Sequence, residues 1–205
     1  MKTTTRLFSL LTLALAASSA GAARAQGARF GLKAGASYTS VVGQNVAGAS
    51  HKWGFHGGVL VNFKLNDRFS LQPEVLYSQK GTKGDGSRNR INLRYVDLPV
   101  LLRAGTGLGG LFVEVGPQLG YLAASDARLD SRTPLTRVTS DFAGSYPAFD
   151  LGYAAGVGYQ LANGLGVGLR YNGGFTPVLK GAAADDTARN SAFQVYLSVL
   201  AGRGQ

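Results

Sequence analysis

A two-residue alternation of apolar and polar side chains, repeated over eight short segments, is the feature that most constrains the fold of this chain. Between residues 69 and 80, Phe69, Leu71, Val75 and Tyr77 alternate with polar residues. The other segments are 30–38, 53–63, 91–103, 113–121, 149–161, 165–172 and 193–199. Alternation with a period of two indicates β-strands that bury one face, and no window keeps the apolar stripe of a helix. The sequence therefore predicts an all-β fold.

The connections between these segments alternate between short and long. The short ones cover 65–68, 104–110 and 162–164, and the long polar ones cover 40–52, 81–90, 123–148 and 177–191. Outer-membrane barrels have short periplasmic turns at one end and longer extracellular loops at the other. We therefore expect an eight-stranded antiparallel up-and-down transmembrane β-barrel with four long extracellular loops.

The charged residues decide which strand face lies inside the barrel. The polar face carries Lys33, Glu74, Lys80, Glu114, Asp150 and Arg170. These groups could not fill the dry core of a soluble barrel without uncompensated charges, whereas inside a narrow membrane barrel they can pair. The opposite face places aromatic residues near strand ends, where interfacial girdles lie. The sequence therefore predicts a polar lumen and an apolar face turned toward lipid.

The first 25 residues have a different organisation. Lys2 and Arg6 precede the apolar run 7–17, and Ala23-Arg24-Ala25 supplies a cleavage site. These are the features of a signal peptide. A spanning helix would need roughly 20 apolar residues, more than this run holds. We therefore expect a cleaved leader at 1–25 and a barrel domain at 26–205.

Composition and charge limit the kinds of binding partner that the protein can have. The chain has no cysteine, which excludes disulfides and thiolate metal sites, and its net charge is +10. Loss of three basic residues with the leader leaves 18 basic against 11 acidic residues, a net charge of +7. Since an exported barrel meets no nucleic acid, we expect outer-membrane lipid and lipopolysaccharide as anionic partners, and no nucleic acid.

Five segments, in this order, carry a resemblance to a known family. They are FGLKAG at 30–35, FSLQPEVLYSQKG at 69–81, YVDLPVLL at 95–102, VGPQLG at 115–120 and GVGLRYN at 166–172. The sequence resembles the outer-membrane β-barrel family common in Bacteroidetes that contains the PorT-like proteins. The resemblance implies an eight-stranded barrel in the outer membrane, insertion by the barrel assembly machinery and, for most members, no defined biochemical activity.

The lumen charges have two interpretations. They form ion pairs that hold the barrel shut, or they line a polar conduit. An eight-stranded barrel has an interior just wide enough for side chains, whereas aqueous channels belong to barrels of about 16 strands. We therefore favour a structural or surface-interaction protein with a filled lumen. The alternative is a narrow pore or a barrel subunit of a secretion or uptake complex.

Two small groups of residues remain as candidate sites. His51 and His56 could serve as a base in a membrane hydrolase, but they do not converge and no serine motif accompanies them. We therefore expect no enzymatic activity, no catalytic residue, no cofactor and no metal. Lys83, Arg88 and Arg90 form a basic group in the second long connection. Their charge predicts a contact with lipopolysaccharide phosphates.

Overall fold

The computed structural model describes residues 28–42, 49–84, 90–128, 147–177 and 189–201. Within these ranges the strands are β1 (Ala28–Val42), β2 (Ala49–Ser50), β3 (Lys52–Lys64), β4 (Phe69–Gly84), β5 (Arg90–Gly105), β6 (Leu111–Arg128), β7 (Phe149–Gln160), β8 (Leu165–Pro177) and β9 (Arg189–Ala201). The expected signal peptide at 1–25 lies outside the described residues, as do residues 129–146 of the third long connection.

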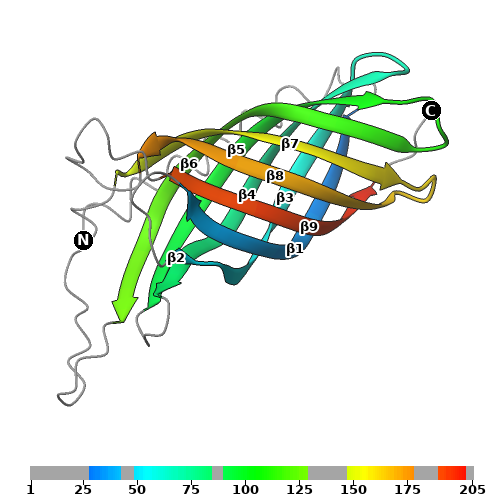
Figure 1. Cartoon of the computed structure of the whole chain (residues 1–205). Helices are drawn as coiled ribbons and strands as arrows, with labels where there is room; N and C mark the ends of the chain where they lie inside the picture. The colour runs from blue at the N-terminus through cyan, green and yellow to red at the C-terminus, as the bar shows by residue number, and fades with distance from the viewer. Residues whose placement is uncertain (1–27, 43–48, 85–89, 129–146, 178–188, 202–205) are drawn as a thin grey trace.

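The eight long strands close into one barrel (Figure 1). Around the wall their order is β4-β3-β1-β9-β8-β7-β6-β5, and β5 pairs with β4 to complete the circle. Each pairing between neighbours is antiparallel, including that of β1 with β9. Closure leaves no long strand with an unpaired edge, as a membrane-spanning sheet requires. The predicted eight-stranded antiparallel barrel is confirmed.

Several strands run further than the alternation predicts. β4 continues to Gly84 and β5 begins at Arg90, so residues 81–84 and 90 of the expected loop at 81–90 belong to strands. β6 extends to Arg128, and the short β2 lies within the expected loop at 40–52 and pairs with β4. The bounds predicted for these loops were therefore wrong. Alternation marks only strand with one apolar face, whereas backbone pairing continues where both faces are polar.

The two ends of the barrel differ. At the turn end, connections join Lys64 to Phe69, Gly105 to Leu111 and Gln160 to Leu165. The Asn66 side-chain oxygen accepts hydrogen bonds from the backbone N–H groups of residues 68 and 69 at 2.9 and 2.8 Å. Gly164 has a φ of 91°, which suits the tight connection before β8. The opposite end, where β1, β4, β6 and β8 finish, is called the loop end.

The outer face of the barrel is apolar. Trp53 is 68% exposed and Leu197 67% exposed, as expected for side chains that meet lipid. Toward the loop end, aromatic rings touch their neighbours on adjacent strands: Tyr38–Trp53, Phe55–Tyr77, Tyr121–Phe149, Tyr153–Tyr171 and Tyr171–Phe193. This belt matches an interfacial aromatic girdle. Among the described residues, none forms a helix of the length and apolarity needed to cross a bilayer.

Three strand prolines coincide with gaps in the pairing. Between β4 and β5 the register passes from Pro73↔Val100 directly to Leu76↔Asp97, which skips Pro99. Similar gaps lie beside Pro73 in the β3–β4 pair and beside Pro117 in the β5–β6 pair. Proline has no backbone N–H to donate to a ladder. The missing donor of each proline therefore accounts for the gap beside it.

Candidate functional site

The polar face of the strands lines the lumen. The charged side chains buried in it, each at most 7% exposed, are Lys33, Glu74, Lys80, Asp97, Arg103, Glu114, Asp150 and Arg170. All six candidates from the sequence are among them, joined by Asp97 and Arg103. Counted over this set, four cations meet four anions. The described lumen charges therefore balance, which buried ion pairs require.

One ion pair crosses the full width of the barrel. Arg170 on β8 donates to both carboxylate oxygens of Glu74 on β4, at 2.7 and 2.9 Å. Three long strands separate β4 from β8 in either direction around the wall, so the two residues come from opposite sides. Both side chains are fully buried. This two-point contact ties opposite walls together, with the geometry that makes arginine–carboxylate pairs strong.

The same pair is the centre of a larger network. Lys33 on β1 donates to Glu74 at 3.1 Å, and its ammonium lies 3.6 Å from the ring centre of Tyr196. Arg170 also donates to Glu114 on β6 at 2.8 Å, and the Tyr196 hydroxyl donates to the same Glu114 oxygen at 2.9 Å. The central network thus links strands β1, β4, β6, β8 and β9 across the lumen.

Toward the turn end, Arg103 on β5 extends the network. Its guanidinium donates to the Gln72 side-chain oxygen at 2.6 Å and lies 3.8 Å from Glu114. It also stacks on the Phe112 ring, 3.5 Å from the ring centre. Beyond this layer the barrel opens into a hollow of about 1140 Å³, lined in part by Arg103, Phe112 and Arg29. The Arg103 layer therefore separates the central network from the turn-end mouth.

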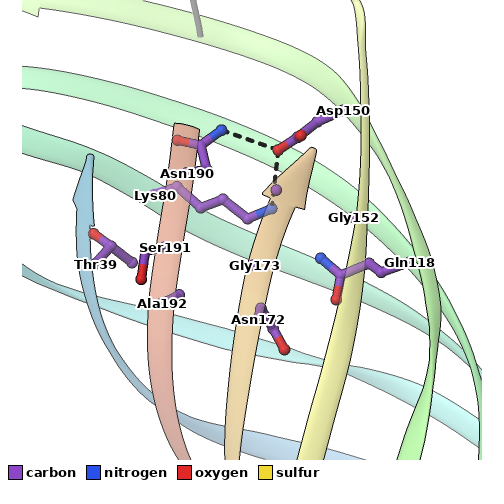
Figure 2. A pocket seen from close by; sticks show the side chains of 11 residues that line it. Thr39, Lys80, Gln118, Asp150, Gly152, Asn172, Gly173, Asn190, Ser191 and Ala192 are labelled. Carbon is purple, nitrogen blue, oxygen red and sulfur yellow. Dashed lines mark hydrogen bonds and ion pairs between the residues drawn. The ribbon is translucent and has the colours of Figure 1, made fainter. Parts of the chain in front are cut away.

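Toward the loop end lies a separate loop-end cluster, made of Lys80, Asp97 and Asp150. Lys80 donates to Asp97 at 2.9 Å, and its ammonium is 3.9 Å from Asp150 (Figure 2). Asn190 donates to Asp150 at 2.9 Å, and Lys80 lies 4.5 Å from the ring centre of Tyr95. Here one cation faces two anions, so this part of the lumen is anionic.

The two histidines lie apart and in different surroundings. His51 is exposed between β2 and β3, and its ring stacks on Tyr38 with the ring centres 4.5 Å apart. His56 on β3 is 1% exposed in the lumen, where Ser37 lies 2.9 Å from its Nδ1. In the described ranges no three His, Asp or Glu side chains gather as metal ligands. The contacts of the two histidines are those of packed side chains rather than those of a catalytic pair.

Only part of the candidate lipopolysaccharide contact lies in the described chain. Lys83 near the end of β4 and Arg90 at the start of β5 are direct partners across the hairpin. Arg90 also faces Arg128 on β6. Arg88 lies outside the described residues. The backbone therefore brings three basic positions of three strands together at the loop end.

Sequence analysis missed several lumen residues. Asp97 lies within an apolar stretch, and Arg103 ends the same segment, so neither was included among the lumen charges. Tyr95 and Phe112 are buried inside as well, although aromatic residues were expected mainly on the lipid face. The strict period of two was the available signal, since each of these residues has the parity of a lumen neighbour.

Comparison with known proteins supports the fold and the location. The family described as "Outer membrane protein beta-barrel domain" matches residues 18–180. No curated protein is similar enough to the chain to count as a match.

The chain is similar to two solved structures, of which the first shows the same fold. The crystal structure of Neisserial surface protein A has 16% identity and a TM-score of 0.56, and the match covers 85% of this chain and 99% of that one. The crystal structure of Ail from Yersinia pestis has 10% identity and a TM-score of 0.48, with 86% and 100% covered. The family match spans most of the chain, and the barrel geometry agrees with it. The chain therefore belongs to the outer-membrane protein β-barrel domain family and is an integral β-barrel of the bacterial outer membrane.

Proposed function

We propose that this protein is a closed outer-membrane barrel with a structural or surface-interaction role, whose long loops contact partners outside the cell. The proposal rests on the Arg170–Glu74 ion pair, whose side chains span the lumen between opposite walls. The nitrogen of Arg170 lies 2.7 Å from the Glu74 carboxylate oxygen. Arg103 and Phe112 form a second layer of side chains on the turn-end side of this ion pair. A continuous water path through these layers would require buried ion pairs to separate, which is costly.

The orientation follows from the connections. The turn end carries the short connections, and short turns face the periplasm in bacterial barrels. The loop end would then face the exterior, with the aromatic belt near the outer membrane surface. The closer kinship with the PorT-like barrels of Bacteroidetes rests on the five sequence segments alone, and it remains part of this proposal.

Single-channel recording tests the closed lumen. Purified protein is inserted into planar lipid bilayers, and the wild type is expected to give no steady current. A variant carrying Glu74→Ser, Arg103→Ser, Phe112→Ser and Arg170→Ser is the control, since it removes long side chains from both layers that fill the lumen and is expected to conduct. A steady current from the wild type would contradict the proposal and support the narrow pore or the transport-complex subunit.

We also propose that Lys83, Arg88 and Arg90 bind lipopolysaccharide phosphates. Support comes from the register, which makes Lys83 and Arg90 direct partners at the loop end. Replacing all three by glutamine is expected to weaken lipopolysaccharide binding, measured by surface plasmon resonance on barrels in nanodiscs. The control replaces two basic residues of the turn end, Lys64 and Arg68, by glutamine. Equal binding by the loop-end variant and the wild type would refute this contact.

A further inference from the structure

The hollow at the turn-end mouth of the barrel is large enough for a small molecule. Its volume is about 1140 Å³. Ligand pockets in proteins typically have roughly 300–1,000 Å³. On its inner side the hollow ends at the Arg103 layer, where the guanidinium stacks on the Phe112 ring. Residues of the connections after β3 and β5 line its rim, among them Arg68 and Gly107. The hollow therefore admits a guest from the turn end.

The charged side chains around this hollow are mostly positive. Within the described ranges, its lining includes four cations and one anion: Arg29, Lys64, Arg68, Arg103 and Asp67. Their sum is a net charge of +3. The carboxylate of Asp67 is exposed and lies 3.1 Å from the Lys64 ammonium. Because a concave surface lined by one sign of charge concentrates ions of the opposite sign, the hollow attracts anions.

The strand register brings three of these cations to neighbouring positions. Lys64 on β3 pairs with Ser70 on β4, and Ser70 pairs with Arg103 on β5. Two strand spacings therefore separate Lys64 from Arg103, about 10 Å between their Cα atoms. Arg29 on β1 pairs with Asn62 on β3, so it is a diagonal neighbour of Lys64 at about 7–8 Å. Side chains as long as these reach one guest from such separations.

Arg29 brings a hydrogen-bond donor without a partner to the hollow. Its terminal nitrogen donates to the Leu200 carbonyl oxygen at 3.3 Å. Its Nε is buried and has no hydrogen-bond partner in the described part of the chain. The acceptor Gln160 Oε1 is in the same condition, but it lies beside Gly166, where an added Cβ would come within 2.9 Å of it. Since a buried donor without a partner costs free energy, the Arg29 side of the hollow suits a guest that accepts hydrogen bonds.

We propose that the turn-end hollow binds a compact polyanion that carries two or more phosphate groups. Two phosphate groups carry a charge of about −3 to −4 at pH 7, which balances the lining, whereas three carboxylates would be needed for the same effect. Three of the four lining cations are arginines, and a guanidinium matches phosphate oxygens with two parallel hydrogen bonds. A Cβ added to Gly107 at the rim would meet no atom within 4 Å, so the space for such a guest is open there.

The test is isothermal titration calorimetry with sodium pyrophosphate, on the full-length barrel in phosphatidylcholine nanodiscs at physiological ionic strength and without divalent cations. The wild type is expected to bind pyrophosphate saturably. The double variant Lys64→Gln with Arg68→Gln lowers the net charge of the lining to +1, so its binding is expected to be about tenfold weaker or more. The matched control is Lys83→Gln with Arg90→Gln, which removes the same charge at the loop end and is expected to bind like the wild type.

A second variant covers the case that the double variant at the turn end does not form a closed barrel. Arg29→Gln removes the buried guanidinium and leaves both turn residues in place, and it is also expected to weaken pyrophosphate binding. The proposal is overturned if the wild type shows no saturable binding. It is equally overturned if folded Lys64→Gln with Arg68→Gln protein, or folded Arg29→Gln protein, binds pyrophosphate as tightly as the loop-end control.

The lipid of the nanodisc distinguishes two sources of the phosphate groups, a soluble diphosphate and a lipid headgroup with two phosphates. Pyrophosphate binding is compared in nanodiscs that contain cardiolipin and in nanodiscs that contain phosphatidylglycerol at equal headgroup charge. Weaker binding in cardiolipin supports the proposal with the lipid headgroup as the guest, because cardiolipin then competes for the hollow. Equal binding supports the proposal with a soluble diphosphate as the guest.

Discussion

Replacing Glu74 by glutamine is expected to destabilise the barrel more than replacing Arg170 by methionine. The reason is the charge count of the central network. Lys33, Arg103 and Arg170 face Glu74 and Glu114, a net charge of +1. Glu74→Gln leaves three cations with one carboxylate, a net charge of +2, whereas Arg170→Met leaves two cations with two carboxylates. Buried charge without compensation is what makes such substitutions costly.

The contacts of Glu74 and Arg170 determine how far the two variants differ in the free energy of unfolding. Glu74 accepts from Arg170 at 2.7 and 2.9 Å, from Lys33 at 3.1 Å and from Gln72 at 2.7 Å. Removing its charge breaks a buried pair and is expected to cost about 3–5 kcal/mol. Arg170→Met loses strong hydrogen bonds but keeps the Lys33–Glu74 pair, so its expected cost is about 1–3 kcal/mol.

Trp53 provides the assay. It is the only tryptophan of the chain and lies on the lipid face, away from the lumen. Its emission should shift to longer wavelength when the barrel unfolds into water, so urea titration in lipid vesicles gives the free energy of unfolding. Migration of boiled and unboiled samples on a denaturing gel checks independently that each variant forms a closed barrel.

The double variant provides the sharpest comparison. Glu74→Gln with Arg170→Met returns the network to a net charge of +1, so the double variant is expected to be more stable than Glu74→Gln alone. Contacting residues show coupling of about 0.5–3 kcal/mol in such cycles. The reasoning is refuted if Arg170→Met is the more damaging single change, or if the two costs simply add.

Three further substitutions test other parts of the fold with the same urea titration. Gly164→Ala is expected to cost about 1–3 kcal/mol, because φ is 91° there and a Cβ would collide with the carbonyl oxygen of Leu200; an unchanged stability would contradict that turn geometry. Val195→Arg places a charge in the middle of β9 on the lipid face and is expected to cost about 2–4 kcal/mol. Leu108→Arg, at an exposed turn-end position, is expected to stay within about 0.5 kcal/mol of the wild type; equal costs at both positions would refute the assignment of the lipid face.

The sequence was sufficient to assign strand residues to the lumen face or to the lipid face of the barrel. A strand turns successive side chains to opposite sides, so the parity of one residue fixes the direction of its neighbours. Lys33, Glu74 and Arg170 were assigned to the lumen on this ground, and all three are buried there. The argument needed no knowledge of which strands lie opposite each other, because the inside of a closed barrel is common to all strands.

The same argument could not predict which lumen side chains pair with each other. Arg170 meets Glu74 across 96 residues of sequence, and that contact depends on how far each strand is shifted along the wall. Alternation gives the face of a residue but not its height in the barrel. Asp97 and Lys80 illustrate the point, since they pair at 2.9 Å although neither residue predicts the other from spacing.

The glycine content and the ion-pair network are two aspects of one packing problem. A narrow lumen cannot hold a large side chain at every inward position, so each large residue needs a small one beside it. A Cβ on Gly168 would lie 2.5 Å from the Tyr196 hydroxyl, and a Cβ on Gly158 would strike the Phe112 ring. Tyr196 in turn donates to Glu114 at 2.9 Å. A larger residue at 168 would therefore displace the ring that fixes Glu114, so the inward glycines are part of what holds the charged network in place.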